Sequence, residues 1–275
     1  MDDVSLSFGT IGNAASFASQ AAGPVRAAFP RLSEPRPYPD AQAMFAAVRA
    51  GEIDAAIGSL ATRAGGFTPM VDAVLGSEPP LYVAHEQEIP FRACLLAHSE
   101  ARREDVLTIY GGHASLPLAA DFVRDAMPWA RCAAQDNGVD TAARILAGDR
   151  SIAMLGTRIM AAHGFGLLAE DIDGEASGIW WVVSNKPLFA ATPALLVLAA
   201  RLGDDGGLGR LAADAAAAGW TLSSCASKPS RARLLEADTL LRLRGTGPLA
   251  NAERLAARHG ARLLGALAST VSEAA

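Results

Sequence analysis

The sequence has no long apolar run, no neighbouring pair of cysteines and no cluster of basic residues. Its longest apolar stretch, residues 190–200, is interrupted by a proline and is shorter than the roughly 20 residues that span a bilayer. The three cysteines, Cys94, Cys132 and Cys225, are far apart, which favours free thiols in a reducing cytoplasm over a disulfide framework. The first residues, MDDVSLSFG, have neither the basic nor the apolar part of a signal peptide, so we expect a cytoplasmic protein.

Histidine is also scarce, and charge is sparse. The chain has 5 His residues, none of them paired at metal-ligand spacing, so we expect no metal and no cofactor. The net charge is −5 and the Lys and Arg residues are dispersed, which argues against nucleic acid as a partner. A small anionic substrate would therefore need local cations or dipoles.

Apolar residues, by contrast, are abundant. They make up 51% of the 275 residues, against 19% charged, so the chain can bury a sizeable core and is long enough for two domains. Up to about residue 187, short apolar strands alternate with helical patterns, which predicts an α/β domain with largely parallel sheets. Strands are expected at 4–8, 53–60, 91–97, 106–110, 151–155 and 180–184, and helices at 16–28, 40–50, 118–126, 140–147 and 158–163.

After residue 188 the pattern changes. Strands are expected at 194–200, 221–226, 234–244 and 262–267, with helices at 206–219 and 248–259. This β-α-β-β-α-β order is the ferredoxin-like split unit. The sequence therefore predicts two domains, 1–187 and 188–275.

Several motifs in the first domain resemble the prephenate dehydratase family. The segment Phe45–Ile57 is similar to the family's Phe-x-Ala-Val-x-x-Gly-x-x-Asp-x-x-Val, and Ser16–Ala22 is similar to Thr-Phe-Ser-x-Gln-Ala-Ala. Ile89–Leu96 resembles Leu-Pro-Ile-x-x-Cys-Leu-Leu, and Tyr110–His113 resembles a Tyr-Ser-His turn. Gly166–Ile172 is similar to the segment that precedes the catalytic strand.

The second domain resembles the ACT domain that follows in that family. Gly206–Leu208 is similar to its Gly-Ala-Leu motif, and Ala226–Pro229 to its Glu-Ser-Arg-Pro motif. The resemblance implies a two-lobed, periplasmic-binding-protein-like (type II) domain with the substrate in its cleft, a ferredoxin-like ACT domain, and homodimers or homotetramers. It also implies a possible amino-acid effector, contacted by Gly206, Leu208 and Ser227. Ala226 and Lys228 replace the family's Glu and Arg, which makes inhibition by phenylalanine doubtful.

The chain departs from the family at three polar sites. Gly178, Ile179 and Trp180 align with the family's Thr-Arg-Phe, and Gly138 and Val139 with its Ser-Thr. Residues 61–63 align with its Glu-Asn-Ser loop. In the family, the Thr supplies a proton to the ring hydroxyl of prephenate and the Arg holds a carboxylate. Glycine has no proton to supply, and an isoleucine side chain cannot bind an anion.

Loss of this acid predicts a changed outcome. Without a proton on the hydroxyl, prephenate can lose CO2 and keep its oxygen, as in the non-aromatising prephenate decarboxylase branch of the family, which feeds the secondary metabolism of modified amino acids. Three alternatives stay open: a divergent dehydratase making phenylpyruvate, a lyase or isomerase acting on a related chorismate-derived acid, and an inactive protein that binds or senses amino acids.

The candidate residues for this chemistry each have a structural alternative. Arg63 could replace the lost cation or be a solvated loop residue, and Thr62 could bind substrate or form a turn. Ser16 could bind a carboxylate or cap a helix, with Phe17 beside it. His113 could protonate the ring carbon after CO2 leaves, or cap a helix. Gly178, Ile179 and Trp180 are expected to contact the small anionic cyclohexadiene substrate; Trp180 and Trp181, as neighbours on a strand, must face opposite ways.

Overall fold

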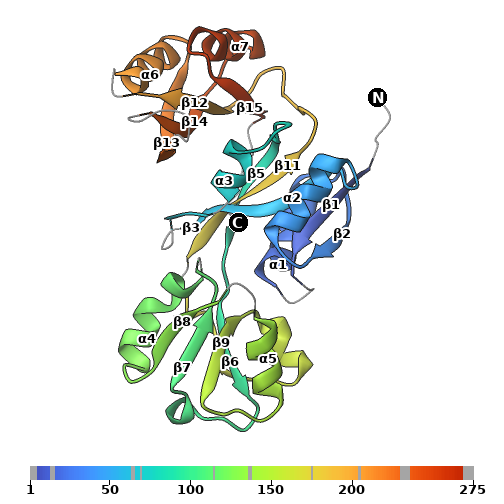
Figure 1. The fold of residues 1–275 in the computed structure, drawn as a ribbon, viewed down its shortest axis with the longest axis vertical. Helices are drawn as coiled ribbons and strands as arrows, with labels where there is room; N and C mark the ends of the chain where they lie inside the picture. The colour runs from blue at the N-terminus through green and yellow to red at the C-terminus, as the bar shows by residue number, and fades with distance from the viewer. Residues whose placement is uncertain are drawn as a thin grey trace.

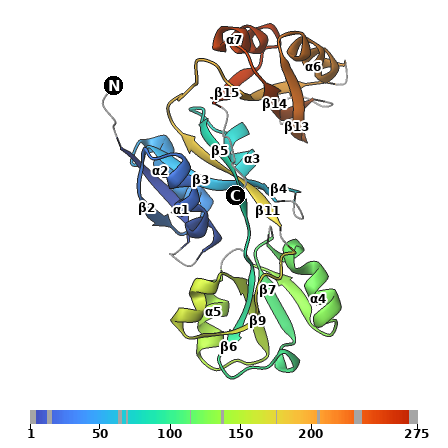
Figure 2. The ribbon, with the colours of Figure 1, turned by 180° about the vertical axis from the view of Figure 1, so that it is seen from behind.

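A computed structural model describes residues 5–12, 16–62, 66–68, 70–113, 115–135, 138–174, 176–203, 206–229 and 236–268. It contains three sheets, each with its own helices, which form two lobes and a C-terminal unit (Figure 1). Seen from behind, the second lobe and the C-terminal unit lie at opposite ends of the molecule, with the first lobe between them (Figure 2). The expected two-lobed α/β architecture is present.

The first lobe is built on a six-stranded sheet in the order β2-β1-β3-β11-β5, with β4 paired to β3. Its strands are β1 (Leu6–Ile11), β2 (Leu32–Tyr38), β3 (Ala55–Thr62), β4 (Gly66–Phe67), β5 (Tyr82–Pro90) and β11 (Ser177–Ser184), and its helices are α1 (Phe17–Ala28), α2 (Ala41–Ala50) and α3 (Met70–Leu75). Sequence patterns missed β2, because its two prolines are typical of loops. The strand tolerates them because it lies at the edge of the sheet.

The second lobe is built on a five-stranded sheet in the order β10-β6-β9-β7-β8. Its strands are β6 (Cys94–His98), β7 (Thr108–Gly111), β8 (Arg131–Ala134), β9 (Ile152–Gly156) and β10 (Phe165–Ala169). Its α-helices are α4 (Ala120–Ala126) and α5 (Val139–Leu146), and its 3-10 helices are η1 (Arg103–Asp105), η2 (Leu116–Ala119) and η3 (Arg158–His163). The helix expected at 158–163 is thus a 3-10 helix.

The two lobes are joined by two segments of the chain. The first runs from β5 to β6 through residues 91–93, and the second runs from β10 to β11. The strand expected at 91–97 is therefore divided between a link and β6. Both sheets are mixed, because β11 pairs antiparallel with β3 and β5, and β6 pairs antiparallel with β9 and β10. The expectation of largely parallel sheets holds only for β2-β1-β3 and β8-β7-β9.

The C-terminal unit has the expected β-α-β-β-α-β order and a sheet in the order β13-β14-β12-β15. Its elements are β12 (Leu195–Leu202), α6 (Gly207–Ala217), β13 (Trp220–Pro229), β14 (Ala237–Gly245), α7 (Leu249–Arg258) and β15 (Arg262–Leu267). One face of the sheet packs against α6 and α7 around Trp220, Leu198 and Leu241. This face forms the unit's own core.

The other face of the same sheet packs against the first lobe. Val197 and Leu264 belong to one apolar cluster with Val83 and Trp181 of the first lobe. The approach is close at Gly265, where an added Cβ would lie 3.1 Å from the backbone oxygen of Val83. The C-terminal unit therefore shares a hydrophobic core with the first lobe and is not connected to it by the linker alone.

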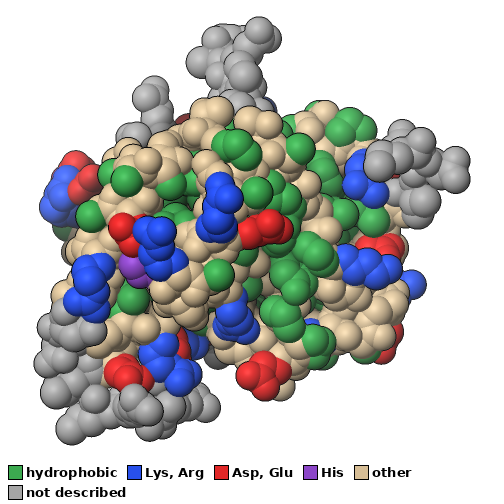
Figure 3. Space-filling model, turned by 90° about the horizontal axis from the view of Figure 1, so that it is seen from above, with side chains coloured by type: hydrophobic (Ala, Val, Ile, Leu, Met, Phe, Trp, Pro, Cys, Tyr) green, Lys and Arg blue, Asp and Glu red, His purple; other side chains and the backbone are tan. Residues whose placement is uncertain are grey.

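Charged side chains are distributed over the face that Figure 3 shows, which is the molecule seen from above the C-terminal unit. Lys and Arg side chains are scattered there among Asp and Glu, with apolar side chains between them (Figure 3). No helix among the described residues is both long and apolar enough to cross a membrane.

Candidate active site

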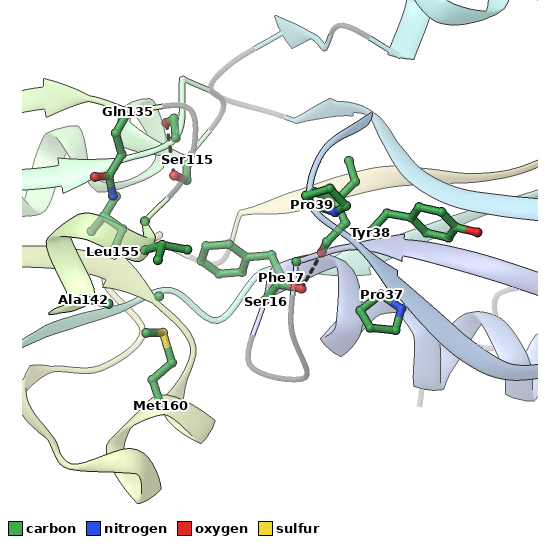
Figure 4. Close-up of a pocket in the computed structure, with 16 residues that line it drawn as sticks. Ser16, Phe17, Pro37, Tyr38, Pro39, Ser115, Gln135, Ala142, Leu155 and Met160 are labelled. Carbon is green, nitrogen blue, oxygen red and sulfur yellow. Dashed lines mark hydrogen bonds between the residues drawn. The ribbon is translucent and has the colours of Figure 1, made fainter. Parts of the chain in front are cut away.

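A cleft of about 700 Å³ lies between the two lobes (Figure 4). Phe17 reaches from the first lobe towards Leu155 of the second, so the two side chains narrow the middle of the cleft (Figure 4). The first lobe contributes Ile11, Gly12, Ser16, Phe17, Pro37, Tyr38 and Pro39, and the second contributes Gly112, Ser115, Gln135, Gly138, Val139, Ala142, Leu155, Gly156 and Met160.

Ser16 begins α1 at the wall of the first lobe. Its Oγ accepts a hydrogen bond from the backbone N–H of Ser19 at 3.1 Å and donates one to the carbonyl of Ile11 at 2.8 Å. The hydroxyl is therefore committed to capping the helix and closing the preceding loop. An anion at this wall would instead meet the N-terminal end of α1, where the helix dipole is positive.

The second lobe presents the N-terminal end of α5 to the same cleft. Gly138 precedes this helix and contributes no side-chain cap. Beside it, the Oε1 of Gln135 accepts a hydrogen bond from Thr141 at 2.6 Å, which leaves the amide N–H groups of Gln135 as donors. Ser115 is committed elsewhere, because its Oγ donates to the carbonyl of Gly112 at 3.1 Å.

The cleft is mostly apolar and carries no formal charge on the described residues that line it. An anion held there would be bound by helix dipoles and neutral N–H groups, which act strongly where little water screens them. The walls on either side of those donors, including Phe17, Leu155 and Met160, are suited to a ring. The described lining residues can thus bind a small cyclic acid, and they include no carboxylic acid, histidine or lysine that could offer it a proton.

Gly178 lies directly beneath the ring of Phe91. A Cβ at position 178 would be 2.5 Å from Cε2 of Phe91, closer than real side chains approach. The ring of Phe91 also contacts Phe17, at 5.6 Å between centroids, and Trp180, at 6.1 Å. The place next to this strand where a threonine side chain would lie is therefore filled by an aromatic ring.

Ile179 points to the other face of β11, away from Phe91. It lines a smaller cavity of about 230 Å³ with Ala61, Thr62, Glu88 and Ser177. The hydroxyl of Ser177 hydrogen-bonds to Glu88. This cavity shares no lining residue with the cleft, so the carboxyl group of Glu88 and the hydroxyl of Thr62 belong to a separate place.

The candidate residues are thus divided among several places. Ser16 and Phe17 line the cleft, while Thr62 and Ile179 line the smaller cavity. His113 is exposed next to the cleft residue Gly112 but is not among the lining residues. Arg63 lies outside the described residues.

The two adjacent tryptophans face opposite ways, as expected, but neither lines the cleft. Trp180 is 5% exposed and lies in one core cluster, and Trp181 is fully buried in another. The ring of Trp180 contacts Phe91, and Phe91 in turn contacts the lining residue Phe17.

The three candidate effector residues lie on two elements of the C-terminal unit, the start of α6 and the strand β13. Gly206 begins α6, and Leu208 is partly exposed in its first turn. Ser227 hydrogen-bonds to Thr239 at 2.8 Å and lines a cavity of about 530 Å³. That cavity lies against α3 of the first lobe and includes neither Gly206 nor Leu208; its other lining residues are Phe67, Thr68, Val71, Asp72, Cys225, Ala226 and Lys228.

Sequence patterns missed Gln135 and Phe91. Gln135 lies in a loop between β8 and α5, where no periodicity marks it. Phe91 aligns with an isoleucine of the family motif, and Gly178 aligns with a threonine. A larger residue at one position and a smaller one at the other could have indicated that the two side chains pack together. Among the described residues, no group of three His, Cys, Asp or Glu side chains could hold a metal ion.

The family of the chain follows from its match to a known family model. The family model described as "Prephenate dehydratase" matches residues 8–187, which is more than half of the chain. The chain belongs to the prephenate dehydratase family. No curated protein matches it.

Solved structures show the same fold across nearly the whole chain. A prephenate dehydratase from Arthrobacter aurescens, solved in complex with L-Phe, has a TM-score of 0.80 and 22% identity, covering 98% of this chain and 92% of that one. A protein described as GqqA, a novel type of quorum-quenching acylase, has a TM-score of 0.75 and 17% identity, with coverage of 96% and 98%. The prephenate dehydratase of Staphylococcus aureus has a TM-score of 0.68 and 14% identity, with coverage of 95% and 100%.

Proposed function

We propose that this protein is a lyase that removes CO2 from prephenate and leaves the ring hydroxyl in place. The family assignment supports a lyase that acts on prephenate. The observation that carries the finer proposal is the position of Phe91 over Gly178. The family's proton donor has been replaced by a residue without a side chain, and the space has been taken by a ring that cannot donate a proton.

Two substitutions compensate for one another in volume. The family motif has threonine where this chain has Gly178, and isoleucine where it has Phe91. A threonine at 178 could not coexist with the ring in its present position, since even a Cβ would lie 2.5 Å from it. The pair thus supports a site that has been repacked behind Phe17 and has no acid at position 178, which differs from a site that has lost one group and kept the space for it.

Decarboxylation needs little from such a site. The bond between the ring carbon and its carboxylate breaks, and its electron pair moves through the ring double bonds to a distant ring carbon, which takes up a proton. An apolar wall disfavours the charged carboxylate relative to neutral CO2. Because nothing protonates the hydroxyl, water is not expelled and the ring does not become aromatic.

Binding of the dianion is assigned to groups from both lobes. The N-terminal ends of α1 and α5 line the cleft, and the amide of Gln135 adds neutral donors. Arg63 follows Thr62, whose Cα is paired with that of Gly178, and we propose it as the cation that binds a carboxylate. Its replacement by alanine should raise KM strongly.

His113 is proposed as the donor of the proton to the ring carbon. It follows Gly112, which lines the cleft, in the turn after β7. General acid catalysis of this kind commonly contributes about 10²–10⁴-fold to the rate. His113→Gln should therefore lower kcat by about that factor with little change in KM.

The C-terminal unit is proposed to be an ACT domain, with residues 1–187 as the catalytic domain and 188–275 as the ACT domain. Its element order supports this, and the similar Arthrobacter aurescens structure holds L-Phe. We propose an amino-acid effector contacted by Gly206, Leu208 and Ser227, a homodimer or homotetramer, and a cytoplasmic location.

The test is to incubate the purified protein with prephenate while following absorbance and product mass. A product that has lost only CO2 supports the proposal. Phenylpyruvate, which has lost both CO2 and water, contradicts it. No turnover, together with a melting temperature raised by an amino acid, would instead support a binding or sensing protein.

A further inference from the structure

A buried ion pair joins the C-terminal unit to β5, the strand that pairs with β11. Glu86 lies on β5 and Arg242 on β14, 156 residues apart, and both side chains are less than a tenth exposed. The Nε of Arg242 donates to Oε2 of Glu86 at 2.9 Å, and its Nη2 donates to Oε1. Nη1 donates to the Oγ of Ser224 at 3.1 Å, which orients the guanidinium from behind.

The same carboxylate also holds β11. Trp181 lies opposite Glu86 in the pairing of β11 with β5, and its indole Nε1 donates to Oε2 of Glu86 at 2.8 Å. Trp181 is fully buried, so this hydrogen bond has no water to replace it. The carboxylate of Glu86 thus connects Arg242 of the C-terminal unit to Trp181 of β11.

The face of β11 opposite to Trp181 lies behind the cleft and supports the lining residue Phe17 through two aromatic contacts. Trp180 contacts Phe91, and Phe91 covers Gly178 and contacts the cleft residue Phe17. Because the backbone of β11 is common to both faces, the position of Trp181 sets that of Trp180. A displacement on the side of Glu86 would therefore reach Phe17.

The surroundings of the ion pair indicate a positioning role. The contact between the C-terminal unit and the first lobe includes apolar packing, such as Val197 against Val83. Its other polar contacts involve more exposed groups: the exposed pair Lys228–Asp72, the part-buried hydrogen bond of Arg262 to the carbonyl of Leu75, and the exposed Arg244, 3.6 Å from Glu86. Apolar packing is weakly directional, whereas a buried carboxylate with three fixed donors admits one arrangement. Burying such a pair adds little net stability. A role in fixing geometry therefore accounts for it better than a role in stability.

We infer that Arg242 is a positioning residue for the cleft: through Glu86 and Trp181 it holds β11 so that Phe91 stays over Gly178. Activity then depends on the C-terminal unit being docked, and a ligand that moved β14 would alter catalysis through this route. The kinetic part of this inference rests on the proposed function, while its structural part does not.

The first readout requires no activity. The protein is labelled with ¹⁵N at its four indoles, and the Trp180 and Trp181 signals are assigned with Trp180→Phe and Trp181→Phe. In Arg242→Met/Glu86→Leu, which leaves no buried charge behind, the Trp180 signal should shift although neither changed residue touches it. Arg201→Met is the matched control, because Arg201 pairs with Asp238 on the exposed part of the same sheet; its Trp180 signal should stay in place.

The second readout is turnover of prephenate. In the double variant, kcat/KM should fall at least tenfold through kcat, while Arg201→Met stays within twofold of the parent. Arg242→Lys, which keeps the charge and is least disruptive to folding, should show a smaller change of the same sign in both readouts. An unshifted Trp180 signal in folded double variant and Arg242→Lys would overturn the inference. A shifted signal with no turnover by any form would support the positioning role and reject the proposed function.

Discussion

The ring of Phe91 occupies the space into which any side chain at position 178 would point, with Cε2 at 2.5 Å from the place of a Cβ. Neither residue can be enlarged independently, because Phe91 is itself held between Phe17 and Trp180. This relationship links the stability of the first lobe to the lack of a proton-donating side chain at position 178.

Gly178→Ala should therefore destabilise the protein by about 1–3 kcal/mol, the usual cost of overpacking a core. Chemical denaturation measures the change. The matched control is Gly209→Ala, which adds the same methyl group inside α6 with nothing within 4 Å, and should stabilise the protein by up to about 1 kcal/mol. Equal effects at the two positions would show that Phe91 does not fill the space.

Charge at the mouth of the cleft should control the KM for prephenate. Val139 lines the cleft and is 68% exposed, so it can be replaced without disturbing the core. Val139→Glu should raise KM and Val139→Lys should lower it, because charges about 5 Å apart in a partly hydrated site interact by about 1–3 kcal/mol. Leu146→Glu, on the same helix but outside the lining residues, should leave KM unchanged. If all three variants behave alike, substrate does not bind in this cleft.

His85 should make the stability of the first lobe depend on pH. It is 7% exposed and stacks on Phe29, and burial lowers its pKa below the usual 6.5 despite opposing contributions from Gln87 and Glu86. Below pH 6.5 this histidine is protonated in the unfolded chain but stays neutral in the folded chain. The free energy of unfolding should therefore fall as pH drops from 6.5 towards the lowered pKa. Above pH 6.5 this contribution is constant.

Denaturation in urea between pH 7.5 and pH 5 measures this loss. His85→Phe keeps a ring against Phe29 and should remove part of the pH dependence. His163→Gln, at an exposed position, should not. The interpretation fails if His85→Phe and the parent lose stability in parallel over this range.

The cysteines should differ in reactivity. Cys94 is 2% exposed and burial raises the pKa of its thiol, whereas Cys225 is exposed on β13. A thiol reagent should modify Cys225 in the native protein and Cys94 only after unfolding. Cys132→Ser/Cys225→Ser provides the sharpest check: it should give no signal until denaturant is added, and rapid native labelling would show that β6 is open.

The sequence predicted most strands and helices correctly because those elements carry a local signal. Apolar runs marked β3, β9 and β12, and capping residues marked the starts of helices, as at Ser16 and Asp40. The missed strands lack such signals. In β5 the residues 85–88 are His-Glu-Gln-Glu, which is typical of an exposed segment, yet Glu86 is buried by its partner Arg242.

The site was harder to predict because it is made by contacts between distant residues. Phe91 and Gly178 are far apart in sequence, as are Glu86 and Arg242, and periodicity carries no information on such pairs. Thr62 and Ile179 were placed in the cleft because the family's polar residues align there. The strand alternation of β11 instead puts Ile179 on the face opposite to the ring of Phe91, in a separate cavity.

The most direct test of the account is proton NMR of prephenate during turnover, which follows the ring proton on the carbon that bears the hydroxyl. This signal should persist in a product with no aromatic resonances, while CO2 is released in step with substrate loss. Aromatic resonances of phenylpyruvate, appearing as the carbinol signal disappears, would contradict it and show that the protein still protonates the hydroxyl.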